Sequence, residues 1–386
     1  MKYNFDRVVD RYGTYSVKYD PRTRGKPVDA LPMWVADMDF PTPPCVQDAL
    51  TERARHGIFG YSEPDAGYFS AVQGWFEKRF GWRVEQKWLS ITPGVVNAIY
   101  IAVRAFTKRG AGVLIQQPVY YPFESAVKHT GRELLVNELT YRDGKYGIDF
   151  DDFEAKARCA SLFILCNPHN PVGRVWTRDE LMRMGEICLK YRVVVISDDI
   201  HQDFVYNGHR HLVFSELDKR FAGITVTCTA PSKTFNLAGL PHANIFIAND
   251  SMRREFRNGY ASIGLSQPGV MGIVACKAAY EGGAQWLDEL ISYLSGNMSL
   301  IREFLPAHTP KIKFVEPEGT YLAWLDFSAL GLAPRELDDA VTDKAKLWFN
   351  SGPTFGMGGA GFQRMNVGCP RSLLRVALER LKSIAA

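Results

Sequence analysis

The run Val193-Val194-Val195-Ile196-Ser197-Asp198 decides the fold class, because four β-branched apolar residues lead almost directly into a carboxylate. An apolar run of this length is typical of a strand that is buried on both faces, as in a parallel sheet. Further apolar or β-branched runs are spaced along the middle of the chain, at 113–117, 133–138, 162–166, 225–229 and 244–248. Amphipathic stretches such as 178–191 separate them, so we predict an α/β fold with a mostly parallel sheet covered by helices on both faces.

The two ends of the chain follow another pattern. A long helical stretch at 284–304 precedes two short strand candidates, a helix at 334–345, a Gly-rich loop and a final helix. The first forty-odd residues are rich in proline and aromatic residues and show little periodicity. A chain of 386 residues suffices for two or three domains of roughly 150 residues each. We therefore predict a large domain at 46–280 and a smaller α+β domain formed by 1–45 and 281–386.

Composition and charge argue against several classes of binding partner. The net charge is only +4 and no segment concentrates lysine and arginine, so we predict no nucleic-acid partner. The seven cysteines include no CxxC, which is typical of reduced thiols in a cytoplasmic protein. The first residues are polar and no apolar run is long enough to span a bilayer, so we expect a soluble protein without a membrane partner. The sequence contains neither an HExxH motif nor a Cys/His quartet, so we predict no metal site.

One lysine follows the strand predicted at 225–229, in the sequence TAPSKT at 229–234. Most lysines are solvated surface charges, but Pro231 fixes a turn here, and Ser232 and Thr234 place hydroxyls beside Lys233. The pKa of a lysine falls readily on burial, and a neutral amine can form a Schiff base with an aldehyde. Lys233 is therefore a candidate for such chemistry.

Other chemically useful residues follow neighbouring strands. Asp198 ends its strand at the edge where open α/β sheets bind ligands, although Asp198 and Asp199 have the alternative of capping a helix. Asn170 lies in a rigid loop with two Asn-Pro-type turns. Val95 and Val96 open an apolar helix after Pro-Gly, and a helix N-terminus favours a phosphate. Each of these signals is weak when taken alone.

Together the segments resemble the aspartate-aminotransferase superfamily, the fold-type-I pyridoxal-phosphate enzymes. That family orders a phosphate loop, a stacking aromatic residue, an Asn-Pro loop, a buried Asp, a Schiff-base lysine and a late arginine. The same order is found here in Gly94, Tyr120, Asn170, Asp198, Lys233 and Arg364. The resemblance covers nearly the whole chain. It implies a mostly parallel seven-stranded sheet in the large domain and pyridoxal 5′-phosphate as the cofactor.

Local strings are closer still to the MalY/PatB branch, the cystathionine β-lyase-like C–S lyases. These strings are MWVADMDF at 33–40, GIFGYS at 57–62, SDDIH at 197–201, TYLAWLD at 320–326 and RMNVGCPR at 364–371. Asp199 replaces the glutamate that is usual in the branch. Two departures from aminotransferases support the placement, because His201 stands where they carry tyrosine and Pro241 where they carry a phosphate-gripping arginine.

The resemblance implies roles for three catalytic residues. Lys233 would hold the cofactor as a Schiff base and remove the Cα proton, while Asp198 would keep the pyridine nitrogen protonated. Tyr120 would stack on the ring, although the adjacent Tyr121 is not excluded from that role. The implied reaction is β-elimination of cystathionine or a related cysteine S-conjugate to pyruvate, ammonia and a thiol.

The resemblance also implies the binding residues. The substrate carboxylate would be held by Arg364, with Asn170 and Tyr61 contributing to the same site. The cofactor would contact residues from several loops: Val95, Val96, Tyr120, Asn170, Asp198, His201, Ser232, Lys233 and Tyr61. Because the family builds each site from two subunits, Tyr61 would come from the partner in a homodimer.

Three functions are alternatives to a C–S lyase. An aminotransferase would use the same cofactor and lysine, and only its products distinguish it. A regulatory binding role is the second, because a member of this branch restrains a transcription activator, but no segment here identifies such a surface. A hydride-transferring dehydrogenase is disfavoured, because no GxGxxG follows a predicted strand.

Overall fold

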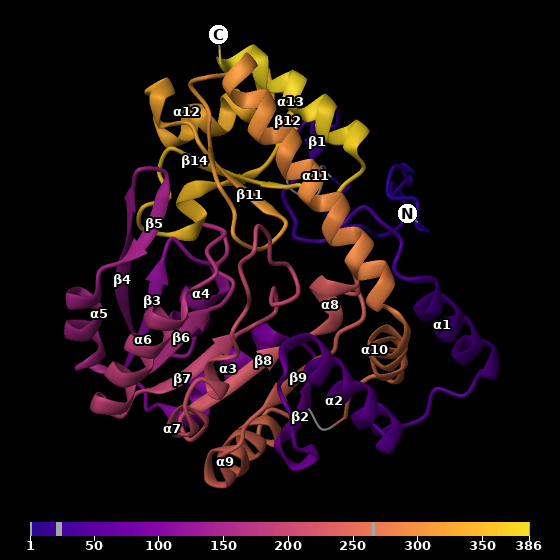
Figure 1. Cartoon of the computed structure of the whole chain (residues 1–386), viewed down its shortest axis with the longest axis vertical. Coiled ribbons are helices and arrows are strands. Elements are labelled where there is room, and N and C mark those ends of the chain that lie inside the picture. Colours follow the sequence, from indigo (N-terminus) through magenta and orange to yellow (C-terminus); the bar gives the residue numbers. More distant parts are fainter. Residues whose placement is uncertain (1, 21–24, 265–266, 386) are drawn as a thin grey trace.

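The computed structural model describes residues 2–20, 25–264 and 267–385. Its largest sheet has eight strands in the order β2-β9-β8-β7-β6-β3-β4-β5 and occupies the lower half of Figure 1. The strands are β2 (Leu89–Thr92), β3 (Gly112–Gln117), β4 (Glu133–Arg142), β5 (Lys145–Ile148), β6 (Ala160–Cys166), β7 (Val194–Asp198), β8 (Thr225–Thr229) and β9 (Ala243–Phe246). β4, β3, β6, β7 and β8 pair in parallel, whereas β9 is antiparallel to both β8 and β2. The predicted α/β class is confirmed.

Successive side chains of the central strands point to opposite faces, and helices cover both. On β6, Leu162 and Ile164 pack in a cluster with α3 (Val95–Phe106), α4 (Pro122–His129) and α9 (Asp250–Ala261). Phe163 and Leu165 of the same strand pack on the other face, against α5 (Phe150–Ala157) and α6 (Arg178–Tyr191). Burial on both faces explains why these strands read as continuous apolar runs.

The sheet has one strand more than the seven that the resemblance implied. β5 forms an antiparallel hairpin with β4 at the edge of the sheet. Asp143 and Gly144 make the turn with φ of 52° and 78°, the left-handed conformation that an Asp-Gly hairpin turn adopts.

A second, antiparallel sheet of four strands lies above the first in Figure 1, in the order β10-β11-β14-β13. These strands are β10 (Lys313–Val315), β11 (Leu322–Asp326), β13 (Asn350–Ser351) and β14 (Phe362–Asn366). In the N-terminal part of the chain, β1 (Leu31–Pro32) pairs in parallel with β12 (Leu347–Trp348), so this segment lies against the small domain. The other helices are α1 (Pro44–His56), α2 (Ala66–Phe80), α7 (Lys219–Ala222), α8 (Pro231–Thr234), α10 (Val270–Gly282), α11 (Ala284–His308), α12 (Pro334–Asp339) and α13 (Arg371–Ala385).

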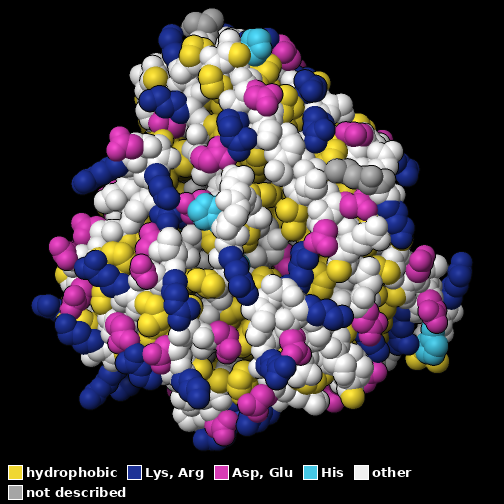
Figure 2. Space-filling model, viewed as in Figure 1, with side chains coloured by type: hydrophobic (Ala, Val, Ile, Leu, Met, Phe, Trp, Pro, Cys, Tyr) yellow, Lys and Arg dark blue, Asp and Glu magenta, His cyan; other side chains and the backbone are white. Residues whose placement is uncertain are grey.

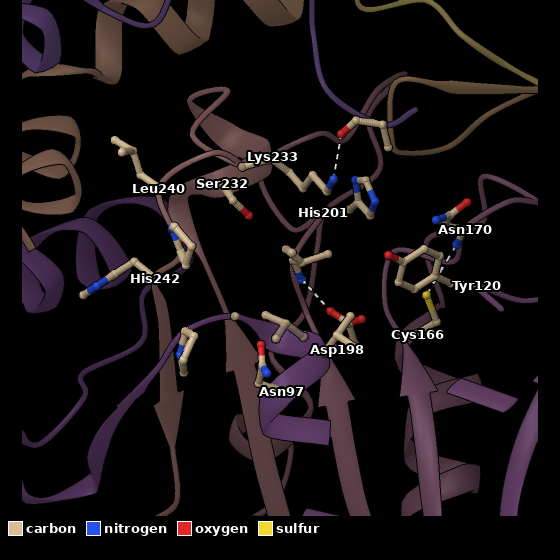
Figure 3. Close-up of a pocket in the computed structure, with 18 residues that line it drawn as sticks. Asn97, Tyr120, Cys166, Asn170, Asp198, His201, Ser232, Lys233, Leu240 and His242 are labelled. Carbon is tan, nitrogen blue, oxygen red and sulfur yellow. Dashed lines mark hydrogen bonds between the residues drawn. The ribbon is translucent and has the colours of Figure 1, made fainter. Parts of the chain in front are cut away.

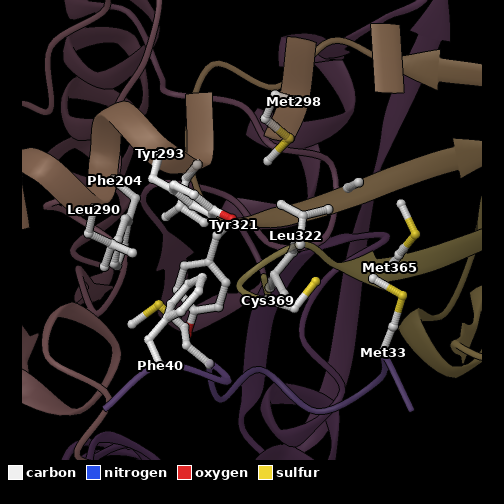
Figure 4. Close-up of a cluster of buried hydrophobic side chains, with 14 of the residues drawn as sticks. Met33, Phe40, Phe204, Leu290, Tyr293, Met298, Tyr321, Leu322, Met365 and Cys369 are labelled. Atoms are coloured by element: carbon white, nitrogen blue, oxygen red, sulfur yellow. The ribbon is translucent and has the colours of Figure 1, made fainter. Parts of the chain in front are cut away.

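We propose the division into a large domain at 46–280 and a small domain formed by 1–45 and 281–386, because each part contains its own sheet. The two parts share one hydrophobic cluster (Figure 4), in which Phe204 packs with Leu290 and Tyr321. Met33 and Phe40, from the first forty residues, lie in the same cluster. The cavity described below is lined by residues that follow strands of the large sheet and by Ala36 of the N-terminal segment.

Three features of the structure concern the partners that the chain could bind. On the face drawn in Figure 2, lysine and arginine side chains are interspersed with aspartate and glutamate. Among the described residues no helix is both long and apolar enough to cross a membrane. Within the same residues, no three His, Cys, Asp or Glu side chains are grouped so that they could hold a metal ion.

Candidate active site

Five loops converge at one edge of the large sheet. Because β2, β3, β6, β7 and β8 run in the same direction, their carboxyl ends bring these residues together: Gly94, Tyr120, Asn170, Asp198 and Lys233. They surround a cavity of about 180 Å³ (Figure 3). Eight of the predicted site residues line it: Val95, Val96, Tyr120, Asn170, Asp198, His201, Ser232 and Lys233.

Lys233 lies in α8, the single turn of helix that follows β8. Its Nζ donates a hydrogen bond to the carbonyl oxygen of Ala36 over 2.6 Å. Burial lowers the pKa of Lys233 to about 8; Asp37 and Asp198 act to raise it, and Arg364 lowers it further. A neutral amine is therefore accessible near neutral pH, as a nucleophile or general base requires.

Asp198 is a buried carboxylate without a cationic hydrogen-bond partner. Its side chain is 3% exposed and accepts only the backbone N–H of Ile200, over 3.1 Å, among the residues described. Burial raises the pKa of Asp198 to about 7, and the neighbouring Asp199 also raises it. A cationic group in the cavity would favour the charged form and relieve this penalty.

The alternative of a helix cap does not apply to Asp199. Its carboxylate is buried, accepts a 2.5 Å hydrogen bond from the hydroxyl of Ser197 and lies 3.4 Å from Nε2 of His211. Asp199 therefore points away from the cavity into a polar cluster behind β7, which leaves Asp198 as the carboxylate of the site.

The N-terminus of α3 forms one end of the cavity. The first backbone N–H groups of a helix lack intrahelical acceptors, and no described residue accepts from Val95 or Val96. Gly94 caps the helix in an extended conformation without a side-chain hydrogen bond. The Ser232 side chain lines the same cavity. These groups can bind an anion such as a phosphate.

Arg364 does not line this cavity but is linked to it through Asn170, which does. Its guanidinium donates to Oδ1 of Asn170 over 3.0 Å, to the carbonyl of Trp34 over 2.9 Å and to Asn350 over 2.5 Å. Burial lowers the pKa of Arg364 to about 10, and the residue is only 3% exposed. No carboxylate among the described residues pairs with it, so this buried cation is available for an anionic ligand.

The aromatic residues of the site are distinct in position. Tyr120 lines the cavity, whereas Tyr121 is 41% exposed and lies outside it, near Phe355. His201 is 3% exposed, its ring packs against Tyr321, and its Nδ1 has no hydrogen-bond partner among the described residues. Burial lowers the pKa of His201, as do Lys233 and Arg364, so this imidazole is neutral at pH 7.

Tyr61, like Arg364, is a predicted residue that a single chain does not bring to the cavity wall. It is 96% exposed, on the loop between α1 and α2, beside the exposed Ile58 and Phe59. It lines a separate groove of about 850 Å³. The groove adjoins the cavity, because Pro93, Leu240 and Pro241 line both.

Sequence reasoning missed several residues of the cavity wall. They are Ala36, Asn97, Cys166, Ile200, Ala238, Leu240 and His242. Asn97 follows Val96 in the string that opens α3, so its proximity was a usable signal. Ala36 contributes a backbone carbonyl, which no side-chain pattern can reveal.

The site combines a buried amine, a carboxylate that pairs with no cation among the described residues, and a helix N-terminus. Together at the carboxyl edge of the sheet they define an α/β enzyme built around a reactive lysine. The chain belongs to the aminotransferase class I and II family, whose model matches residues 29–381.

Comparisons with individual proteins agree with this assignment. The chain is 47% identical over 383 residues to cystathionine beta-lyase PatB of Bacillus subtilis (strain 168), covering 98% of this chain and 99% of that protein. The structure of cystalysin from Treponema denticola, which contains a pyridoxal 5′-phosphate cofactor, is similar with a TM-score of 0.96 and 37% identity, covering 100% and 99% of the two chains. A PLP-bound C–S lyase from Staphylococcus hominis has a TM-score of 0.93 and 32% identity, again covering 100% and 99%.

Proposed function

We propose that this chain is a pyridoxal 5′-phosphate-dependent carbon–sulfur β-lyase, which converts cystathionine or a related cysteine S-conjugate into pyruvate, ammonia and a thiol. The observation that carries the proposal is that Lys233 and the unpaired Asp198 face one cavity in a chain 47% identical to a cystathionine beta-lyase. The two C–S-lyase-type structures with bound cofactor support the same reading.

The residues present fit this cofactor at each of its polar groups. An aldehyde needs an amine, and Lys233 supplies one whose pKa burial lowers to about 8. A protonated ring nitrogen needs a carboxylate, and Asp198 is buried without a cationic hydrogen-bond partner among the described residues. A phosphate needs donors, which Val95, Val96 and Ser232 can supply at the N-terminal end of α3.

When bound, the cofactor supplies an electron-withdrawing ring adjacent to the substrate Cα. Arg364 holds the substrate carboxylate, since a guanidinium can donate two parallel hydrogen bonds to it. Nζ of Lys233 takes the proton from Cα as general base. Asp198 keeps a proton on the ring nitrogen, and Tyr120 covers the ring face. The electron pair of the Cα–H bond forms a Cα=Cβ bond as the Cβ–S bond breaks, and sulfur departs with its own pair as a thiolate. Water then hydrolyses the released enamine to pyruvate and ammonia.

Two remaining residues complete the proposal. The Nδ2 group of Asn170 donates toward the ring oxygen, because its Oδ1 is already engaged by Arg364. His201 contributes a neutral imidazole to the cofactor pocket beside Lys233.

Product analysis tests the function. Purified enzyme with cystathionine and no keto-acid acceptor should release pyruvate, ammonia and free thiol in equal amounts. Turnover that requires a keto acid, without pyruvate release from cystathionine, would contradict the lyase and favour an aminotransferase. Borohydride reduction should fix the cofactor on the peptide that contains Lys233, and the Lys233→Ala variant should show no such labelled peptide.

The same proposal includes a homodimer in the cytoplasm. The exposed Phe59 and Tyr61 line a groove that adjoins the cavity, which suits a partner subunit that delivers its Tyr61 there. All seven cysteines are free: Cys159 is exposed, Cys45 is half-buried and the other five are buried. Reduced, mostly buried thiols are consistent with a cytoplasmic protein.

A further inference from the structure

A segment near the N-terminus passes the cavity at Ala36; we call it the strap and define it as residues 33–40. Both of its ends are anchored in the hydrophobic core, where Met33 and Phe40 are 2% and 3% exposed (Figure 4). Phe40 packs edge-on against Phe5 and Tyr293. The strap has no regular secondary structure between β1 and α1, so hydrogen bonds to other parts of the chain must satisfy its backbone.

Six consecutive carbonyl groups of the strap accept hydrogen bonds from donors outside it. The acceptors are those of residues 33 to 38, and the donors belong to Asn366, Arg364, Lys233, Tyr321, Lys18, Arg11 and Asn236. Two of these donors are the cationic groups of the proposed mechanism. Arg364 donates to Trp34, and Lys233 donates to Ala36, two residues further along. The position of one backbone segment therefore contributes to the direction of both groups, and Asn170 and Asn350 hold Arg364 as well.

The Ala36 carbonyl has two donors. Nζ of Lys233 lies 2.6 Å from it and the hydroxyl of Tyr321 lies 2.9 Å from it. A carbonyl oxygen has two lone pairs, so Lys233 can move to another partner without leaving this acceptor unsatisfied. The strap can therefore keep its position when Nζ of Lys233 leaves the Ala36 carbonyl during the reaction.

A cluster of four charges holds the strap on its other side. Arg11 contacts Asp37 and Asp39, each over 2.7 Å, and Lys18 contacts Asp39 over 2.9 Å and Asp37 over 3.8 Å. Lys18 and Asp39 are almost fully buried, while Arg11 and Asp37 are about one-fifth exposed. Loss of one member of such a partly buried network leaves an opposite charge uncompensated.

We propose that the cluster of Arg11, Lys18, Asp37 and Asp39 positions the active site by fixing the strap on which Lys233 and Arg364 rest. The inference rests on the proposed function, because it treats these two cations as the working groups. Asp37 acts in a second way through its charge, which favours the ammonium form of Lys233. Asp198 favours that form as well, Arg364 opposes it, and the neutral His201 also faces Lys233.

Uptake of pyridoxal phosphate by the cofactor-depleted full chain, followed by absorbance at a series of pH values, tests the proposal. The uptake rate depends on the neutral amine, so its midpoint follows the pKa of Lys233. Asp37→Asn removes a negative charge and should move the midpoint to lower pH, by about 0.5 pH unit or more. Arg11→Gln leaves Asp37 less neutralised and should move the midpoint to higher pH. General loosening of the fold cannot produce shifts of opposite sign.

Two further variants serve as controls. Asp37→Glu keeps the charge and should retain the wild-type midpoint. Asp29→Asn removes an exposed carboxylate that pairs with Lys346 over 3.5 Å, outside the strap, and should leave the midpoint and KM unchanged. Because Trp34 orients Arg364, Asp37→Asn and Arg11→Gln should both raise the KM for the amino-acid substrate severalfold.

Each outcome has one interpretation. Midpoint shifts of both variants in the same direction, midpoints equal to that of Asp29→Asn, or a wild-type KM in both variants would overturn the proposal. If Asp37→Asn does not fold, the sign of the Arg11→Gln shift decides, because only an upward shift is compatible with the cluster acting on Lys233. A wild-type chain that takes up no pyridoxal phosphate would contradict the proposed function itself, whereas normal uptake with unmoved midpoints would contradict only this inference.

Discussion

The guanidinium of Arg364 donates a 3.0 Å hydrogen bond to the side-chain oxygen of Asn170, which connects β14 of the small sheet with the loop after β6 of the large sheet. Because this oxygen accepts from Arg364, the amide nitrogen of Asn170 lies on the cavity side in Figure 3. One contact thus orients a donor for the cofactor and keeps a buried cation ready for the substrate.

We expect Arg364→Lys to weaken substrate binding strongly, because an ammonium cannot reproduce the two parallel hydrogen bonds to a carboxylate. The expected loss in kcat/KM is about 100-fold, or roughly 2.7 kcal/mol, and most of it should appear in KM. Steady-state kinetics with cystathionine measure it. The exposed Arg335→Lys is a matched control that should behave as wild type. An unchanged KM in Arg364→Lys would contradict the assignment of the carboxylate site.

The stability of the cofactor-free chain should depend on pH through two site residues. The pKa of Asp198 is raised by burial to about 7 and that of Lys233 is lowered to about 8. The folded chain then binds more protons than the unfolded chain between about pH 4 and 7 and fewer between about pH 8 and 10.5. The free energy of unfolding should therefore fall with rising pH in the first interval and increase in the second, by up to about 1.4 kcal/mol per pH unit for each group.

Urea unfolding across this pH range measures both effects. Asp198→Asn should flatten the acidic interval and Lys233→Met the alkaline one, relative to the wild-type chain. Identical slopes in the wild type and Asp198→Asn would show that this carboxylate is not destabilised by burial.

Tyr120 and Tyr121 should differ in their effect on the cofactor. Tyr120 forms part of the cavity wall, so Tyr120→Leu should raise the Kd for pyridoxal phosphate by about 2- to 10-fold, which corresponds to the usual contribution of an aromatic contact. Tyr121→Leu should change it little. Equilibrium dialysis of both variants provides the comparison, and the reverse order would assign the stacking role to Tyr121.

Shared active sites predict complementation between two inactive variants. Lys233→Ala removes the amine, and Tyr61→Ala removes the residue that we propose reaches the partner's cavity. Random mixing of the two subunits gives mixed dimers with one intact site each, so activity should return to about a quarter of the wild-type value. Assay after co-refolding measures this, with each variant refolded alone as the control. No recovery, in dimers shown to be mixed, would exclude sharing through Tyr61.

Much of the site could be predicted because its residues follow apolar strands directly. The order of Tyr120, Asn170, Asp198 and Lys233 along the chain identifies four loops, and parallel pairing then brings their strand ends together. The length and the apolar character of the runs were enough to predict the strands β3, β6, β7 and β8.

Other elements carried weaker signals. β2 has only four residues, and Pro93 follows it directly. No apolar run in the sequence therefore indicates this strand. β14 buries Gln363 and Arg364, which hides its strand character behind polar residues. β5 was not predicted, although the dipeptide Asp143-Gly144 is typical of a β-hairpin turn. The contacts of the strap could not be predicted, because they are made by backbone carbonyls with donors that include residues more than 330 positions away.

The distribution of the thiols has a practical consequence for spectroscopy. Cys159 precedes β6, at the edge of the large sheet opposite the loops that bear Asn170 and Asp198, and it is the exposed cysteine of the chain. A thiol-reactive fluorophore should attach there first in the native protein and leave turnover intact. The dye would thus sit remote from the pocket, where it could report tumbling and subunit exchange without perturbing the chemistry.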